Sequence, residues 1–157
     1  MSEDESGEVE FKSTAAASLD NPDIPEKIIN EQVIKTVAAF LNTDGGTLGI
    51  GIADDKTILG IGNDLDLKSM DLDKYINWLT TLLITSCGIG PATACTRIRW
   101  EIVDGKTVVL VDVNPSPKAV YVKTSKNVEA FYVRANNTTQ QLALSEIHDW
   151  FTARRKS

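Results

Sequence analysis

The sequence predicts a mixed α+β domain in which a mostly antiparallel sheet packs against two to three helices. Two observations predict this class. Segments with the period-two alternation of strands outnumber segments with helical spacing, and they follow the order β-α-β-β-α-β-β-β-β-α along the chain. Several strands in succession favour antiparallel pairing, whereas a doubly wound nucleotide-binding fold needs strands and helices in regular alternation.

The first half of the chain alternates strands and helices. Residues 8–12 alternate charged with apolar side chains, as in a half-buried strand, and a loop with prolines follows over residues 13–25. Apolar residues then recur at helical spacing from Glu26 to about Asn42. Beyond an Asp-Gly-Gly break, a strand is expected over Thr47–Ala53. One face of that strand is lined by glycine, which indicates close approach by a ligand, a helix or another backbone.

The middle of the chain predicts one short strand and one long helix. The strand covers Thr57–Ile61, where the chain leaves a turn rich in aspartate. The helix covers Leu72–Ser86, with Asp71 or Ser69 as its N-cap, because both side chains accept hydrogen bonds from a first helical turn.

The second half predicts mainly strands. Alternation indicates strands over Thr96–Ile102 and Thr107–Val113, and the dipeptide Asp104-Gly105 between them is typical of a two-residue hairpin turn. Two further strands are expected over Ala119–Val122 and Phe131–Arg134, and a final helix follows them. The whole pattern contains no internal repeat.

Length and composition predict one domain with a substantial core. The chain has 157 residues, of which 42% are hydrophobic and 24% are charged, close to ordinary globular usage. We expect residues 1–7 to form an acidic lead-in, residues 8–153 the domain and residues 154–157 a basic tail. No apolar run reaches the ~18–20 residues of a membrane helix, so we expect a cytoplasmic protein without a membrane partner.

Cysteine and histidine are too few for a structural zinc site, which normally needs four such ligands. The chain has only Cys87, Cys95 and His148. Reduced thiols are the favoured state of the two cysteines, with a bridge between them as the alternative. His148 has no recognisable Ser or Cys partner, and Lys56 lies in a turn rather than in a phosphate loop. A hydrolase triad and ATP binding therefore lack support.

The distribution of charge separates an acidic region from a basic one. The net charge is −6 and the pI is about 4.8, which disfavours binding nucleic acid by attraction over the whole surface. Counting Asp, Glu, Lys and Arg, residues 1–90 have a net charge of −10 and residues 91–157 of +4. A carboxylate cluster in the first half and a cationic surface in the second would explain this split. An ordinary solvated surface is the alternative.

Carboxylates near the N-terminus suggest a metal site. Glu5, Glu10 and Lys12 form the pattern Glu-x-x-x-x-Glu-x-Lys, and Asp54 and Asp55 follow a strand that could pair beside them. Converging carboxylates tolerate one another when a hard cation such as Mg²⁺ or Mn²⁺ lies among them. Such a cation could assist phosphodiester cleavage, with Lys12 stabilising the developing charge. The alternative is a set of solvated acidic side chains without a catalytic role.

A run of side chains rich in hydrogen-bond donors follows the last predicted strand, and such side chains bind phosphates and base edges. Basic residues elsewhere in the second half could extend it into one surface, with aromatic side chains as stacking partners. A polar loop beside core aromatics is the alternative. The candidate nucleic-acid contacts are Arg97, Arg99, Lys123, Arg134, Asn136, Thr138, Thr139 and Gln140.

Motifs across most of the chain occur in a distinctive order. They are Glu5-x-x-x-x-Glu10-Phe11-Lys12, the helix-to-strand segment 37–52 with its paired glycines, Asp54-Asp55, Phe131–Arg134 and Thr138–Gln140. Together these motifs resemble the Schlafen-type AlbA domain, which occurs in many bacterial proteins and in the Schlafen core. The resemblance spans residues 5–142, and it implies an α+β domain that binds DNA or RNA, with RNA slightly favoured.

The resemblance also implies a metal-dependent activity. In Schlafens that are ribonucleases, two glutamates and an aspartate cleave structured RNA, and by position these are Glu5, Glu10 and Asp54, beside Lys12, with Asp55 as the less favoured choice. Mg²⁺ or Mn²⁺ is then the implied cofactor. The Schlafen core has two lobes where this chain has one, so a homodimer would restore the two-lobed groove. The alternative function is a non-catalytic regulatory or protein-interaction module.

Overall fold

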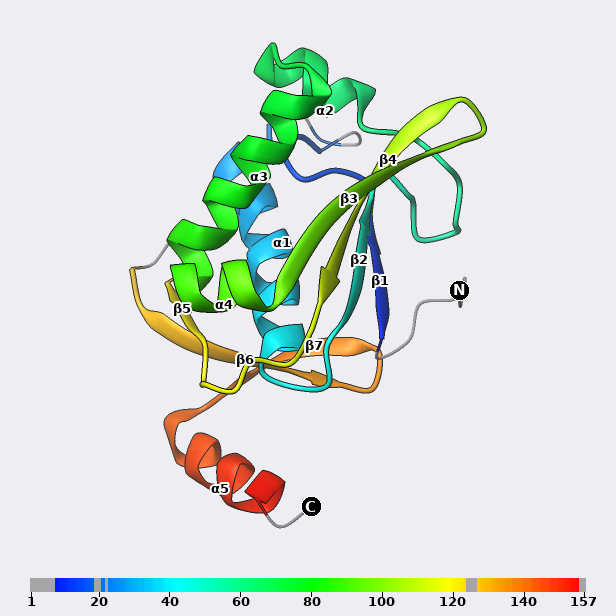
Figure 1. Cartoon of the computed structure of the whole chain (residues 1–157). Coiled ribbons are helices and arrows are strands. Elements are labelled where there is room, and N and C mark those ends of the chain that lie inside the picture. Colours follow the sequence, from blue (N-terminus) through cyan, green and yellow to red (C-terminus); the bar gives the residue numbers. More distant parts are fainter. Residues whose placement is uncertain (1–7, 19–20, 22, 124–126, 156–157) are drawn as a thin grey trace.

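The computed structural model describes residues 8–18, 21, 23–123 and 127–155. Within them, seven strands form two sheets, and five helices accompany the sheets (Figure 1). The predicted α+β class is confirmed. No described helix is long and apolar enough to cross a membrane.

A four-stranded mixed sheet forms the centre of the fold. Its strands are β1 (Val9–Lys12), β2 (Gly46–Ile50), β3 (Thr96–Val103) and β4 (Lys106–Val113), in the order β1-β2-β4-β3. The pair β1 and β2 is parallel, because the long helix α1 (Glu26–Leu41) carries the chain back between them. The other two pairs are antiparallel.

A second sheet of three antiparallel strands lies across the end of α1. It consists of β5 (Tyr121–Lys123), β6 (Glu129–Ala135) and β7 (Thr138–Leu142), with β6 in the middle. Asn42, at the C-terminus of α1, joins this sheet to the helix. Its buried side-chain amide donates to the carbonyl oxygens of Val120 and Tyr132 at 2.9 Å each, and its oxygen accepts from the Val120 N–H at 2.8 Å.

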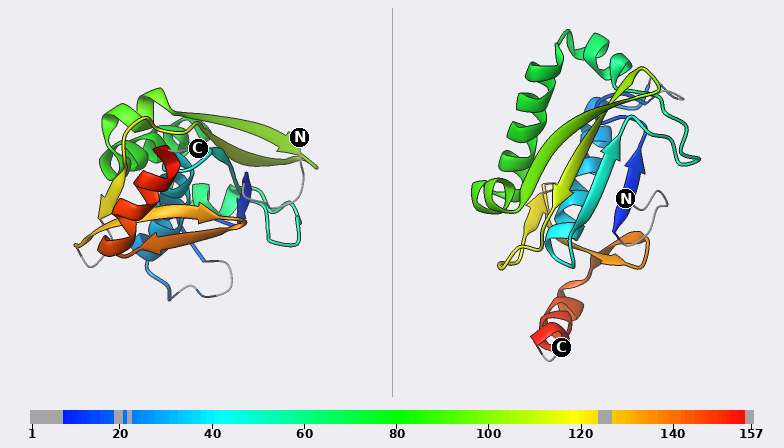
Figure 2. Two further views of the ribbon diagram at one scale, coloured as in Figure 1. Left: turned by 90° about the horizontal axis from the view of Figure 1, so that it is seen from below. Right: turned by 45° about the vertical axis from the view of Figure 1, so that its right-hand side comes forward.

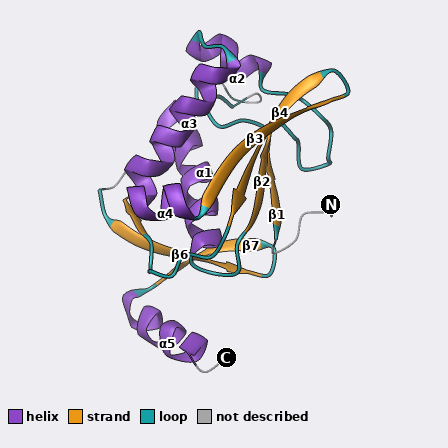
Figure 3. Cartoon of the chain, in the orientation of Figure 1, coloured by secondary structure: helices purple, strands orange, loops and turns teal. Residues whose placement is uncertain are grey.

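The remaining helices are α2 (Gly62–Lys68), α3 (Leu72–Cys87), α4 (Ile89–Ala94) and α5 (Leu144–Arg155). Helices α1 and α3 pack on one face of the four-stranded sheet, and no described helix covers its other face (Figures 2 and 3). We call this second face the open face. Helix α5 lies against the three-stranded sheet, where its residues Trp150 and Phe151 contact the ring of Phe131.

Strand alternation explains how one sheet has a covered and an open face. Leu48 and Ile50 of β2, with Val109 and Val111 of β4, are fully buried against the helices. The intervening residues, Gly49 among them, belong to the open face. The apolar side of α1 completes the core with Val33, Val37, Phe40 and Leu41, all of which are fully buried.

A buried carboxylate fixes the loop that leads from β1 to α1. Asp64 of α2 accepts hydrogen bonds from the Thr14 hydroxyl, from the Ala15 N–H at 2.9 Å and from the Tyr75 hydroxyl at 2.7 Å. Burial, followed by the charge of Asp64, raises the pKa of Tyr75. These three donors satisfy Asp64, so it holds the fold together and does not form part of an open site.

Two strand predictions need correction. The strand expected over Thr57–Ile61 is wrong, because only an isolated bridge between Ile52 and Ile58 forms there. The strand expected over Thr47–Ala53 already ends at Ile50. Gly51 adopts φ +95°, and this left-handed conformation turns the chain out of the sheet. A Cβ on Gly51 would lie 2.9 Å from the Gly60 carbonyl carbon, so the predicted close backbone approach occurs at this glycine.

Three elements were not predicted. Helices α2 and α4 have seven and six residues, too few to display helical periodicity. Strand β7 occupies part of the expected polar loop, because Asn136 and Asn137 form a two-residue turn that pairs Ala135 with Thr138. The predicted cap Asp71 is confirmed, since its side chain accepts from the Lys74 N–H. Both cysteines are buried and free.

Candidate nucleic-acid interface

Glu10 on β1 and Arg134 on β6 form an ion pair between the two sheets. Glu10 pairs with Leu48 in the strand register, so it faces the helix side and not the open face. Its Oε1 accepts from Arg134 Nη1 at 3.1 Å, and its Oε2 lies 3.4 Å from Lys12 Nζ. Arg134 Nη1 also donates to the Thr139 hydroxyl at 2.9 Å. Four predicted site residues thus meet at one junction, which we call the sheet junction.

Burial decides what Arg134 can do at the sheet junction. Its side chain is only 4% exposed, and its guanidinium lies 5.1 Å from the centre of the Phe40 ring. A cation in this position stabilises the packing of β6 against β1 and α1, but it has little surface to offer to a phosphate. Arg134 therefore acts as a brace for the β6-β7 hairpin.

The tip of the β6-β7 hairpin carries the exposed members of the predicted donor-rich run. Asn136 adopts φ +57°, which the two-residue turn requires and which asparagine tolerates. Thr138 donates to the Ala135 carbonyl oxygen at 2.9 Å and accepts from Gln140 at 3.1 Å. Asn136, Thr138 and Gln140 are all exposed. The hairpin thus presents polar side chains on a rigid support.

The arginines of β3 lie on the open face. Arg97 and Arg99 pair with Asp112 and Leu110 of β4, and both side chains project to the side away from the helices. Arg99 donates to Asp112 at 2.7 Å and to Glu101 at 2.7 Å. Arg97 is exposed, and within the described part of the chain it donates to no other side chain.

Asp112 is the centre of a small polar network on the open face. It also accepts from the Thr47 hydroxyl at 2.9 Å. Burial by itself raises the pKa of the Asp112 carboxyl, but the hydrogen bonds from Arg99 and Thr47 and the charges of Arg99 and Arg97 lower it below its usual value of 3.8. The carboxylate is therefore charged at neutral pH and orients Arg99 along the sheet.

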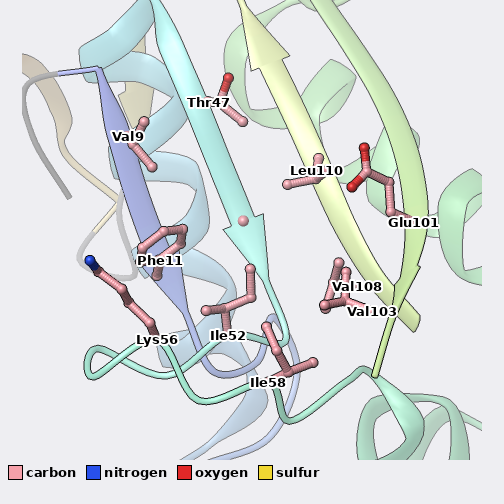
Figure 4. Close-up of a pocket in the computed structure, with 11 residues that line it drawn as sticks. Val9, Phe11, Thr47, Ile52, Lys56, Ile58, Glu101, Val103, Val108 and Leu110 are labelled. Carbon is pink, nitrogen blue, oxygen red and sulfur yellow. The ribbon is translucent and has the colours of Figure 1, made fainter. Parts of the chain in front are cut away.

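An apolar pocket adjoins these arginines on the open face (Figure 4). It has a volume of about 200 Å³. Gly49 contributes the bare floor, because a side chain there would contact Phe11 and Ile52. Polar side chains stand only at the rim. The lining residues are Val9, Phe11, Thr47, Gly49, Ile52, Lys56, Ile58, Glu101, Val103, Val108 and Leu110.

The other predicted site residues lie apart from these two regions. Lys123 is exposed on β5 and pairs with Glu129 in the register of the second sheet. Asp54 is exposed in the turn after β2, and Glu5 lies outside the described residues. In the described part of the chain, no group of three or more His, Cys, Asp and Glu side chains could hold a metal ion. The three-carboxylate metal site stays a prediction.

A comparison with models of protein families shows to which family the chain belongs. The family model described as Schlafen, AlbA_2 matches residues 5–143. The chain belongs to this family. Membership in the Schlafen AlbA_2 family supports a nucleic-acid-binding role. No curated protein matches the chain.

Two of the solved structures that match this Schlafen AlbA_2 domain illustrate the similarity. DIP2311 from Corynebacterium diphtheriae superposes with a TM-score of 0.63 at 19% identity, over 92% of this chain and 26% of that one. The N-terminal domain of a RecG-related protein from Nitrosomonas europaea gives a TM-score of 0.47 at 22% identity, over 87% of this chain and 82% of that one. The chain thus spans about a quarter of DIP2311, and the first similarity shows a shared fold.

Sequence reasoning missed the pocket and the network around Asp112. The alternation of β4 gave no sign that Asp112 would meet Thr47 and Arg99, because strand order is not visible in a single sequence. The glycine-lined face of β2 was the available signal for the pocket, and Gly49 does form its floor.

Proposed function

We propose that this domain binds nucleic acid on the open face of the four-stranded sheet. Family membership supports the class of ligand. The observation that supports the location is the exposure of Arg97 on a sheet face that no described helix covers, next to Arg99 and an apolar pocket. Cations on a strand are held in fixed positions, and phosphate groups can contact them without reorganising the fold.

The acidity of the chain limits how much electrostatic attraction contributes. With a net charge of −6, the chain as a whole repels a polyanion, so binding depends on a few local contacts. Two or three phosphates neutralised at Arg97, Arg99 and Lys56 predict a slope of about −1.5 to −2 for log K against log salt on a single strand.

Single-stranded RNA is the ligand that the pocket fits best. Sequence-specific proteins bind single strands by accepting unstacked bases into apolar sites with a few polar groups at the rim. The pocket has this character, since its walls are aliphatic or aromatic and Thr47 and Glu101 stand at its edge. A carboxylate such as Glu101 can accept a hydrogen bond from a ribose 2′-hydroxyl, which DNA lacks.

Fluorescence anisotropy with labelled single-stranded RNA, single-stranded DNA and duplex DNA, each at several salt concentrations between 50 and 200 mM, tests this proposal. We expect the tightest binding to single-stranded RNA and a shallow negative salt slope. Absence of salt-dependent binding to all three ligands would contradict the proposal and favour the non-catalytic protein-interaction module. Tighter binding to DNA than to RNA would contradict only the RNA preference.

Metal-dependent endoribonuclease activity is a finer form of the proposal, carried by the resemblance to ribonuclease-active Schlafens. Mg²⁺ or Mn²⁺ would supply charge stabilisation at the phosphodiester, with Glu5, Glu10 and Asp54 as ligands and Lys12 nearby. The described residues fit a bound Mg²⁺ or Mn²⁺ ion only in part. Both carboxylate oxygens of Glu10 already face cationic side chains, so a metal ion would have to share Glu10 with Arg134 and Lys12.

Calorimetric titration with Mn²⁺, together with a cleavage assay on tRNA, tests the metal site. Asp54→Asn should abolish Mn²⁺ binding and cleavage. Asp55→Asn is a matched control, because Asp55 is the exposed neighbour whose oxygen accepts from the Thr57 N–H, and asparagine keeps that oxygen. Absence of Mn²⁺ binding by the unmodified chain, or equal effects of the two variants, would contradict this site.

A further inference from the structure

Strand β3 is the longest of the described strands that lie at a sheet edge. It has eight residues, contains no proline or bulge, and lies at the end of the strand order β1-β2-β4-β3. The other edge strands β1, β5 and β7 have four, three and five residues. Proteins usually shorten, bend or cover such edges, because unpaired N–H and C=O groups recruit another strand.

The hairpin turn identifies which groups of β3 point outward. A two-residue turn makes its flanking residues, Val103 and Lys106, a hydrogen-bonded pair. Pairs then alternate along the strands, so Arg97, Arg99 and Glu101 also bond to β4. The backbone groups of Ile98, Trp100 and Ile102 point away from β4. The bond from Ile61 N–H to the Thr107 carbonyl oxygen agrees with this phase, because it places Thr107 among the β4 residues that face away from β3.

Two of these three residues, Trp100 and Ile102, also carry exposed apolar side chains. Trp100 is 47% exposed and Ile102 is 64% exposed, on the helix side of the sheet. Beside them lies an apolar groove of about 280 Å³ between α3, α4 and β3. Its lining residues are Ile76, Thr80, Leu83, Ala92, Thr93, Thr96 and Ile98. Backbone edge, exposed apolar residues and groove therefore occur together at one place.

The sequence of β3 is complementary to itself in one antiparallel register. When Trp100 faces the Trp100 of a second strand, Arg99 lies opposite Glu101 and Ile98 lies opposite Ile102. Shifting the register by two residues places Arg99 opposite Arg99 in one direction and Glu101 opposite Glu101 in the other. Like charges directly opposite each other destabilise a strand pair, whereas opposite charges stabilise it. A shift by one residue would place opposite Trp100 a residue whose backbone N–H and C=O groups already bond to β4.

We propose that β3 pairs with the β3 of a second copy of this chain, with Trp100 on the two-fold axis, and that the two sheets become one sheet of eight strands. In this register Ile102 of the second copy lies opposite Ile98, which lines the groove. The groove thus receives that isoleucine, and the symmetry repeats the contact on the other side.

The proposed dimer brings charged side chains of the two copies together. Arg97 and Arg99 of both copies then lie on the same face of the joined sheet, with the Arg99 and Glu101 side chains of both copies around the two-fold axis. Each Arg99 keeps its bond to Asp112 and gains the Glu101 of the second copy.

Analytical ultracentrifugation of the chain and two variants of α3 tests the interface. We expect a species of twice the 17.1 kDa chain mass. Thr80→Arg places a charge in the groove and should weaken association at least tenfold. Thr81→Arg is the matched control, because Thr81 is exposed on the same helix outside the groove. A monomer at all concentrations, or equal effects of the two variants, would overturn the proposal.

Cysteine cross-linking tests the register independently. Trp100→Cys should form a disulfide-linked dimer under mild oxidation, because residues on the two-fold axis lie ~5.5 Å apart between Cα atoms, within the range for a disulfide. Ile102→Cys should cross-link much more slowly, since its partner is Ile98, although position 102 is more exposed than position 100. The native cysteines are buried and should not react. Equal cross-linking at the two positions would overturn the register.

Discussion

Arg134 and Arg97 lie in opposite surroundings, although the sequence analysis assigned them the same role. Arg134 is 4% exposed at the sheet junction, where it pairs with Glu10, donates to Thr139 and lies over Phe40. Arg97 is exposed on the open face, where its nearest charged neighbour across the strand pair is Asp112. The comparison shows that position in the fold, and not residue type, separates a structural cation from one that can meet a ligand.

The two regions also differ in what they hold together. The sheet junction links β1 to β6 across 124 positions of sequence, so its ion pair stabilises the arrangement of the two sheets. On β3, the printed side-chain partners of Arg99 among the described residues, Asp112 and Glu101, belong to its own sheet. We therefore expect substitutions at the junction to change stability and substitutions on β3 to change binding.

The largest effect is expected for Arg134→Ala. Removing the guanidinium leaves the largely buried Glu10 with Lys12 as its cationic partner among the described residues and opens a gap over Phe40, which should lower the free energy of unfolding by about 3 kcal/mol. Urea denaturation followed by circular dichroism measures this loss. Arg97→Ala, the matched substitution at the exposed site, should change stability by less than ~0.5 kcal/mol. Equal losses of unfolding free energy in the two variants would contradict the distinction between a structural Arg134 and an exposed Arg97.

A smaller loss is expected for Gly51→Ala, which tests the turn that ends β2 beside the pocket. Gly51 has φ +95°, and a Cβ would lie 2.9 Å from the Gly60 carbonyl carbon. Strain and crowding together should cost about 2 kcal/mol. Gly62→Ala serves as the control, since a Cβ there meets nothing within 4 Å. Thermal unfolding of both variants gives the difference, and an unchanged Gly51→Ala midpoint would refute this account of the turn.

The Arg99–Asp112 pair should make a modest, pH-dependent contribution to stability. Because the pKa of Asp112 is lower in the folded chain, the contribution is present above the usual carboxyl pKa and is lost as pH falls below about 3.8. Its size should not exceed ~1 kcal/mol, since the side chains are 36% and 38% exposed and solvent screens them. Carbon-13 NMR titration measures the pKa of Asp112, and Arg99→Ala should move the pKa of Asp112 upward. An unchanged titration in that variant would contradict the assignment.

The local elements were predictable from the sequence, whereas their assembly was not. Helical spacing gave α1 and α3, and Asp104-Gly105 gave the β3-β4 hairpin, because these signals lie within a few residues of each other. The meeting of Glu10 with Arg134 depends on how two sheets are placed across the end of α1. Neither residue carries a sign of that contact in its neighbourhood.

Burial was the second property that the sequence could not supply for the site. Thr138, Thr139 and Gln140 form one polar run, yet Thr139 turns inward to Arg134 while Thr138 and Gln140 are exposed. The alternation of β7 explains this difference, but the run contains no apolar residue that would have revealed a strand.

The salt dependence of RNA binding by Arg97→Ala tests most directly the claim that the open face of the sheet is the binding surface. Losing one phosphate contact should weaken binding by only about threefold, and it should flatten the slope of log K against log salt by about 0.7, the contribution of one phosphate on a single strand. Lys74→Ala removes the same charge from an exposed position on α3, on the covered side of the sheet. The account predicts a flatter slope for Arg97→Ala and an unchanged slope for Lys74→Ala. Equal slopes for Arg97→Ala and the unmodified chain would contradict it.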